Sequence, residues 1–205
     1  MAHHLAKCPQ RQTSKEETGN GQKEKFFQIS VQGRYAPEYW MHLEVAADAK
    51  LKDLDSFLRD IWLECCGHLS GFVIGERNYV SSMVDAAYGD KTMDVKIGSV
   101  LRLGTNFIHE YDYGTTTTLA LRVVSERKGE PKDEQIEIMA RNEPPKIACS
   151  VCGKPATQVC SNCIYDGKGW LCDKCAKSHK CEEEMLLPVV NSPRVGMCAY
   201  AGGYE

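Results

Sequence analysis

Residues 149–181 read CSVCGKPATQVCSNCIYDGKGWLCDKCAKSHKC, and this stretch decides how the C-terminal part of the chain can fold. Six of its cysteines form three Cys-x2-Cys pairs, which are Cys149/Cys152, Cys160/Cys163 and Cys172/Cys175. Two cysteines three positions apart can lie on one tight turn and direct both sulfur atoms at one ion. Zinc takes four such ligands in a tetrahedron, so two pairs make one closed site. Three pairs followed by His179 and Cys181 therefore predict two zinc sites.

Two arrangements of these ligands are open. In a cross-braced arrangement, the first and third pairs share one ion, which is then held by Cys149, Cys152, Cys172 and Cys175. The second pair, Cys160 and Cys163, then holds the other ion with His179 and one further cysteine. That cysteine is either Cys181, one residue beyond His179, or Cys198, which follows Gly196 and its capacity for a close turn. In the alternative tandem arrangement, the first pair joins the second.

The predicted zinc ions are structural. Residues 149–181 hold few apolar side chains, too few to offset the entropy of the chain by burial alone. A structural zinc contributes about 10–16 kcal/mol to the folding of finger peptides. A catalytic zinc keeps one coordination position open for water, whereas this thiolate-rich set has enough ligands to close both sites. No catalytic residue is predicted.

Composition narrows the functional classes. The chain has 205 residues and a formal net charge of −3. From Cys149 to the end, six lysines and arginines face six aspartates and glutamates, so the cysteine-rich part lacks the basic excess of a DNA-reading finger. No apolar run reaches the length of a membrane span, and the N-terminus has no apolar core of signal-peptide length. We expect a cytoplasmic protein with reduced thiols and no membrane partner.

The preceding part of the chain predicts an α+β fold. Alternating apolar residues predict strands at 26–32, 39–45, 69–74, 106–113, 116–125 and 135–140, and an apolar stripe predicts a helix over 51–65. Residues 75–92 are expected to form a loop or a helical turn, residues 99–103 a turn or short strand, and residues 127–132 a charged turn. The order β-β-α-β followed by a strand meander indicates a small β-roll with a ubiquitin-like opening. Burial is expected mostly on the sheet face that the helix covers.

These patterns divide the chain into three parts. Residues 1–24 are polar and predict a disordered tail. Residues 25–142 form the α+β domain, and Pro144-Pro145 stiffens the connection that follows. Residues 147–205 comprise the two-zinc module and a C-terminal extension. The apolar strip at 185–194 is expected either to fold back on one of the two domains or to line a partner groove.

Other cysteines and histidines are interpreted as structural. Cys65 and Cys66 end the apolar helix face and are expected to be small buried residues. His109 lies beside Glu110 and Asp112 in sequence, but neighbouring strand residues face opposite sides of a sheet. A catalytic group at His109 is therefore not favoured.

A resemblance to a known family rests on residues 26–126. Its pieces are YWMHLEVAADAKLKDLDSFLRDIWLECCGHLSGFVI (39–74) and FIHEYDYGTTTTLALRVV (107–124). This region resembles the root-inducing-plasmid open-reading-frame-three-like family, whose members are often labelled insertion-sequence passenger proteins. The family's Tyr-Asp-Phe-Gly motif fits Tyr111 to Gly114, whereas Thr115–Thr118 replace the Asp, Trp and His that usually follow. The resemblance implies an α+β fold and no defined activity.

The C-terminal part resembles a second kind of protein. ATQVCSNC (156–163) and GWLCDKCAKSH (169–179) are similar to the B-box and MYND zinc fingers. Those fingers serve mainly protein recognition, which implies a protein partner here.

We therefore expect a non-enzymatic, zinc-binding adaptor that binds another protein. One alternative is a nucleic-acid-associated accessory protein of mobile elements, as the passenger-protein label implies. The other is an enzyme whose site has not been recognised from the sequence.

Overall fold

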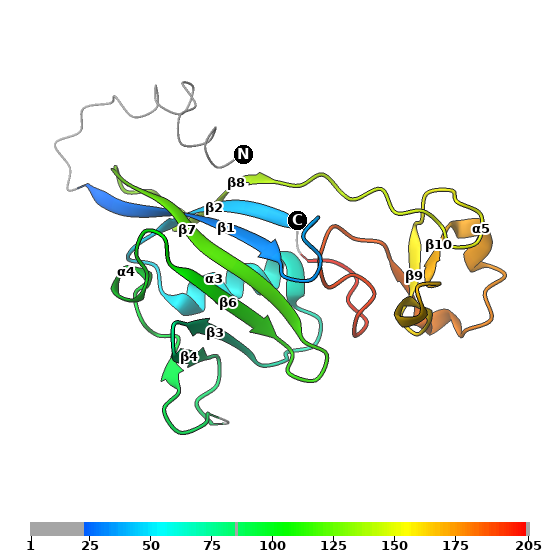
Figure 1. Ribbon diagram of the computed structural model, residues 1–205, viewed down its shortest axis with the longest axis horizontal. Coiled ribbons are helices and arrows are strands. Elements are labelled where there is room, and N and C mark those ends of the chain that lie inside the picture. The colour runs from blue at the N-terminus through cyan, green and yellow to red at the C-terminus, as the bar shows by residue number, and fades with distance from the viewer. Residues whose placement is uncertain (1–22, 85, 204–205) are drawn as a thin grey trace.

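A computed structural model of the chain describes residues 23–84 and 86–203. It is an α+β protein with one large sheet and few helices, as predicted (Figure 1). The predicted tail at 1–24 lies almost entirely outside the described residues. We use three names below: the sheet domain for residues 23–141, the cysteine module for residues 148–188, and the C-terminal segment for residues 189–203.

The sheet domain is built on eight strands in the order β5-β4-β3-β6-β7-β1-β2-β8. Every neighbouring pair is antiparallel except β4 and β5. The strands are β1 (Glu24–Gly33), β2 (Trp40–Ala46), β3 (Ser70–Ile74), β4 (Arg77–Val80), β5 (Lys91–Thr92), β6 (Asn106–Tyr111), β7 (Thr117–Gly129) and β8 (Ile136–Arg141). The predicted hairpin of the first two strands is confirmed. The ubiquitin-like character of this opening stays a prediction.

Helix α3 (Leu51–Leu58) packs against the sheet and continues as the π-helical turn η1 (Arg59–Leu63) (Figure 1). Leu51, Leu54 and Leu58 recur at helical spacing and are fully buried. Trp62 in η1 is buried as well. The predicted apolar stripe is therefore correct, although the regular helix ends earlier than expected.

The predictions for three connecting segments are partly wrong. The segment 75–92 contains β4 and β5, and 99–103 overlaps the short helix α4 (Ile97–Val100). The charged segment 127–132 begins inside β7, whose pairing with β1 runs on to Gly129. Arg127 lies over the ring of Phe26 at 4.6 Å and pairs with Glu44 of β2. Cross-strand ion pairs and a cation–π contact thus keep a charged sequence in the sheet.

The cysteine module is a small three-stranded unit at the far end of an extended connection (Figure 1). Its sheet has the order β10-β9-β11, with β9 (Gln158–Cys160) in the centre, β10 (Trp170–Leu171) on one side and β11 (Leu186–Pro188) on the other. Short helical turns, η2 (Cys163–Asp166), α5 (Asp173–Ala176) and η3 (Glu183–Met185), connect the strands.

The chain enters and leaves this module side by side. Asn142 follows β8, and Asn191 follows β11. The Asn142 side-chain amide donates to Oδ1 of Asn191 at 2.7 Å, and the Asn191 amide donates to the Asn142 carbonyl at 3.1 Å. These reciprocal hydrogen bonds form a neck below the module.

The C-terminal segment lies between the sheet domain and the module (Figure 1). Ser192 donates to the carbonyl of Trp62 at 2.7 Å. Gly196 has a φ of 79° and lies so close to the module that an added Cβ would come within 2.7 Å of Ile164 and 3.1 Å of Val159. The apolar strip at 185–194 thus contributes β11 to the module and then folds back on the sheet domain, so the fold-back prediction is correct.

A buried ion pair fixes the segment to the sheet domain. The Arg194 side chain is fully buried, and its Nη2 lies 2.7 Å from Oδ2 of Asp112. Nη1 donates to the carbonyl of Thr115 and the hydroxyl of Thr117. Burial raises the pKa of Asp112, but the hydrogen bonds from Arg194, Thr115 and Gly114 outweigh this effect and leave that pKa below its ordinary value. The carboxylate therefore stays charged beside the guanidinium.

We predict that Asp112→Asn lowers the free energy of unfolding by about 3–5 kcal/mol, because it leaves the Arg194 charge buried without a counter-charge. Asparagine tolerates the positive φ of 65° at this position, so backbone strain does not confuse the result. Urea denaturation measures the change. The matched control is Asp48→Asn, which removes an exposed pair with Lys96 and should change stability little. A similar small loss for both variants would contradict the prediction.

No helix among the described residues is both long enough and apolar enough to cross a membrane. The cytoplasmic location stays a prediction.

Candidate metal centres

The first cysteine group joins the first and third Cys-x2-Cys pairs. Cys149, Cys152, Cys172 and Cys175 present four sulfur atoms that all lie within 4.8 Å of one another. Cys149 and Cys172 are buried, and Cys152 is exposed. The first pair lies on the turn that follows the connection from the sheet domain. In the third pair, Cys172 is the N-cap of α5 and Cys175 lies within α5. Two separate turns therefore direct their sulfur atoms at one point.

The second cysteine group joins the middle pair to the last ligands. Cys160, Cys163, His179 and Cys181 present three sulfurs and one imidazole nitrogen within the same limit of 4.8 Å. Cys160 ends β9 and Cys163 starts η2, so the pair straddles a strand end. The two groups interleave along the chain, which is the cross-braced grouping and not the tandem one. Cys181 and Cys198 are the two candidates for the eighth ligand. The structure places Cys181 in this group and Cys198 in a different one.

The spacing of these atoms matches a tetrahedral metal site. With Zn–S bonds of about 2.3 Å and Zn–N bonds of about 2.0 Å, tetrahedral angles place ligand atoms about 3.5–3.8 Å apart. The Cys152 and Cys172 sulfurs are 3.6 Å apart. The Cys163 sulfur is 3.6 Å from Cys181 and 3.6 Å from Nε2 of His179. Each group is therefore sized for one ion, and each offers four ligands with no position left open.

The module stabilises some of its thiolates and not others: hydrogen bonds with Cys181 and Cys152 raise the pKa of Cys163 and of Cys175 to about 12, whereas the pKa values of Cys149 and Cys160 are lowered. Burial raises the pKa of Cys149, but backbone hydrogen bonds from Cys172, Val151 and Cys152 lower that pKa to about 6. For Cys160, burial again raises the pKa, while the backbone of Cys163 and the His179 side chain are among the hydrogen-bond donors that bring it to about 7. The thiolate is the form that binds metal, so these hydrogen bonds favour ligation near neutral pH.

The structure shows a third group that the sequence interpretation missed. Cys65, Cys66, His68 and Cys198 also lie with their ligand atoms within 4.8 Å of one another. The prediction that Cys65 and Cys66 are small buried residues is wrong, because Cys66 is exposed and Cys65 only half-buried. The π-helical turn ends the helix at Leu63 and leaves both cysteines in the following loop. Within residues 23–84 and 86–203, three groups, not two, can thus hold metal ions.

All ten described cysteines are free thiols, and all ten belong to these three groups. The eleventh, Cys8, lies outside the described residues. The Cys-x2-Cys spacing could reveal the first two groups. For the third, the only local signal is Cys65-Cys66-x-His68, because the remaining ligand is 130 residues from His68.

His109 has a structural position. Its side chain is fully buried, and Nε2 lies 2.7 Å from Oδ1 of Asp55 on α3. The ring also packs 4.7 Å from the ring of Phe72. This pair therefore joins the helix to the sheet and is closed to a substrate.

Comparison with known proteins gives information about the fold and none about the function. No family model matches the chain, and no curated protein matches it. A crystal structure of a protein of unknown function from Methanosarcina mazei Go1 is similar, with a TM-score of 0.51 and 14% sequence identity. The similarity covers 58% of this chain and 71% of that one. The similarity concerns architecture and carries no activity.

We predict that Cys152→Ser lowers the metal content by at least one ion per chain and unfolds the cysteine module, because the module depends on two interleaved four-ligand sites. Amides of β9 and β10 should lose protection from hydrogen exchange, while those of β1 and β7 keep theirs. Elemental analysis and exchange mass spectrometry measure the two effects. Cys8→Ser is the control and should change neither. An unchanged metal content in Cys152→Ser would refute the first cysteine group as a site.

Proposed function

We propose that the protein is a non-enzymatic, zinc-binding adaptor whose cysteine module is a cross-braced, two-zinc protein-interaction module. The observation that carries the proposal is the pair of complete four-ligand groups in the module. Four thiolate or imidazole ligands saturate a tetrahedral zinc ion, so neither ion has a position for water or substrate. Such ions stabilise a shape, and the function then belongs to the surface that they support.

A groove beside β11 is the part of that surface best suited to a partner. It has a volume of about 980 Å³ and is lined by residues of α5, of the chain around His179 and of β11, among them Ala176, Lys177, Leu187 and Pro188. β11 pairs with β9 alone and is therefore an edge strand, in which Pro188 can accept but cannot donate a backbone hydrogen bond. An extended peptide added to a sheet edge gains backbone hydrogen bonds and side-chain pockets together. We therefore infer an extended segment of another protein as the ligand.

The two alternatives have weaker support. For an enzyme, His109, which the sequence already did not favour as an acid–base group, is buried against Asp55. For a nucleic-acid accessory, the even charge of the module offers no phosphate-binding excess. Membership of the sheet domain in the plasmid open-reading-frame-three-like family, with its mobile-element association, stays a prediction.

Selection from a random peptide library displayed on phage tests the interaction. The zinc-loaded full chain should enrich a common extended motif, and the chelated chain should not, because the groove depends on the fold of the module. Pro188→Asp, at the exposed end of β11, should reduce the affinity for an enriched peptide by about tenfold or more through loss of the groove wall.

The matched control is Pro155→Asp, which makes the same substitution at an exposed position of the module outside the groove. It should bind like the wild type, and both variants should retain their metal. Enrichment that is unaffected by chelation, or equal binding by both variants, would contradict the proposal. Steeply salt-dependent retention on random DNA would instead favour the nucleic-acid alternative.

A further inference from the structure

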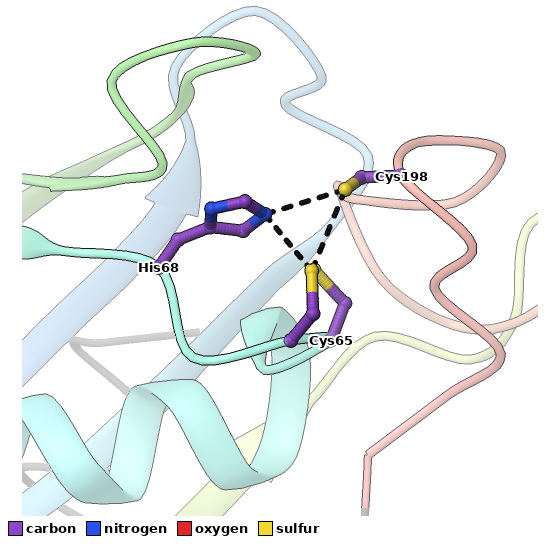
Figure 2. Close-up of side chains that lie close together, drawn as sticks. Cys65, His68 and Cys198 are labelled. Carbon is purple, nitrogen blue, oxygen red and sulfur yellow. Dashed lines mark hydrogen bonds between the residues drawn. The ribbon is translucent and has the colours of Figure 1, made fainter.

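The third cysteine group joins two distant parts of the chain (Figure 2). Cys65, Cys66 and His68 lie in the loop between η1 and β3, and Cys198 lies in the C-terminal segment. The Cys66 sulfur is 3.7 Å from the Cys198 sulfur, 3.0 Å from Nε2 of His68 and 3.5 Å from the Cys65 sulfur. Nε2 of His68 is 3.3 Å from the Cys198 sulfur.

We propose that this group binds a third zinc ion, which clasps the C-terminal segment to the sheet domain. Three sulfurs and one imidazole are a common set for structural zinc, and tetrahedral geometry requires ligand atoms about 3.5–3.8 Å apart. The separations here approach those values. A disulfide does not explain the arrangement, since bonded sulfurs lie about 2.0 Å apart and a disulfide has no use for the histidine.

Hydrogen bonds to a carboxylate that is not one of the four ligands hold the loop in place. Glu64, directly before Cys65, accepts hydrogen bonds from the amide of Gly67 at 2.6 Å, the hydroxyl of Tyr111 at 3.0 Å and Nε of Arg59 at 2.7 Å. One carboxylate thus ties the loop to the helix end and to β6. A loop fixed in this way presents its three ligands with little further ordering, which favours metal binding.

A buried cation supports the ligand sphere. Nη2 of Arg194 donates to the Cys65 sulfur at 3.3 Å while it pairs with Asp112 at 2.7 Å. Hydrogen bonds to ligand atoms orient them and adjust their charge in metal sites. The pair that fixes the C-terminal segment therefore also positions a ligand of the third group.

The segment adopts an unusual conformation to deliver Cys198. Cys198 and Ala199 have φ values of 45° and 55°, in the left-handed region that non-glycine residues avoid. Two such residues in a row persist only where other interactions fix them. A metal bond to the Cys198 sulfur supplies such an interaction.

The third cysteine group lies in the chain next to contacts with both the cysteine module and the sheet domain. Two residues before Cys198, Gly196 lies against Ile164 and Val159 of the cysteine module. Earlier in the same segment, the Ser192 and Arg194 side chains donate hydrogen bonds to the sheet domain. Anchoring Cys198 therefore fixes the surface on which the module packs, and the third ion sets the position of the module relative to the sheet domain.

Counting metal ions in the full-length protein by native mass spectrometry tests this site. The double variant Cys66→Ser/Cys198→Ser should carry one zinc ion fewer than the wild type, while Cys8→Ser should carry the same number. An unchanged count in the double variant overturns the proposal. The result is independent of the proposed adaptor function, because that function rests on the two groups inside the module, which Cys152→Ser tests separately.

A spectroscopic titration gives a second readout of the same site, first in the wild type and then in a variant that keeps every cysteine. Cobalt(II) in a tetrahedral thiolate site gives intense ligand-field bands, so titration should show three equivalents with such bands. His68→Ala, which leaves every cysteine in place, should remove one of the three. Only two tetrahedral equivalents in the wild type, with no change in His68→Ala, would overturn the third site.

Hydrogen exchange tests the clasp itself. In Cys198→Ser, the amides of Val195 and Met197, which donate to the carbonyls of Ser192 and Arg194 at 3.1 Å each, should exchange faster by about tenfold or more, because the segment opens more often. Ala199→Gly is the control, since it relieves the left-handed backbone without removing a ligand and should leave those amides protected. Equal protection in Cys198→Ser and the wild type would show that the segment is fixed without the metal and would overturn the clasp.

Discussion

The C-terminal third of this protein depends on one constraint, which is that residues 148–188 have too little apolar surface to fold without metal–ligand bonds. Their buried apolar side chains amount to a few residues around Val159 and Leu171. The strands have two or three residues each, and the helical turns three or four. Elements of this length do not persist on hydrogen bonds alone. The two interleaved ligand groups draw on β9, η2 and α5, so ions held by these groups would link the short elements to one another.

Much of the fold was accessible from the sequence. The hairpin of β1 and β2 and the apolar stripe of α3 follow from simple periodicity, and so does the interleaved ligand grouping once the Cys-x2-Cys spacing is considered. The errors occur where local polarity conflicts with tertiary contacts. Strand β7 continues into a charged stretch because Arg127 packs over the ring of Phe26 and pairs with Glu44, which lie on other strands of the sheet. A sequence pattern alone does not contain those neighbours.

The third group shows the same limit more sharply. Cys65 and Cys66 follow an apolar helical stripe, and extension of that stripe makes them appear to be core residues. The π-helical turn changes their direction and moves them into a loop. Their fourth partner, Cys198, comes from a segment whose return path depends on the buried Arg194–Asp112 pair. Only the assembled fold brings the two halves together, so no spacing rule could reveal them.

The neck formed by Asn142 and Asn191 has a consequence for how such a protein could arise and be altered. Because the chain departs from and rejoins the sheet domain at one hydrogen-bonded point, the cysteine module is topologically an insertion. Its two ends are already adjacent, so a short turn could bridge them in its place. The exchange has one condition: Val159 and Leu187 of the module belong to the same buried cluster as the sheet domain, so a replacement at the neck must cover that apolar surface as well.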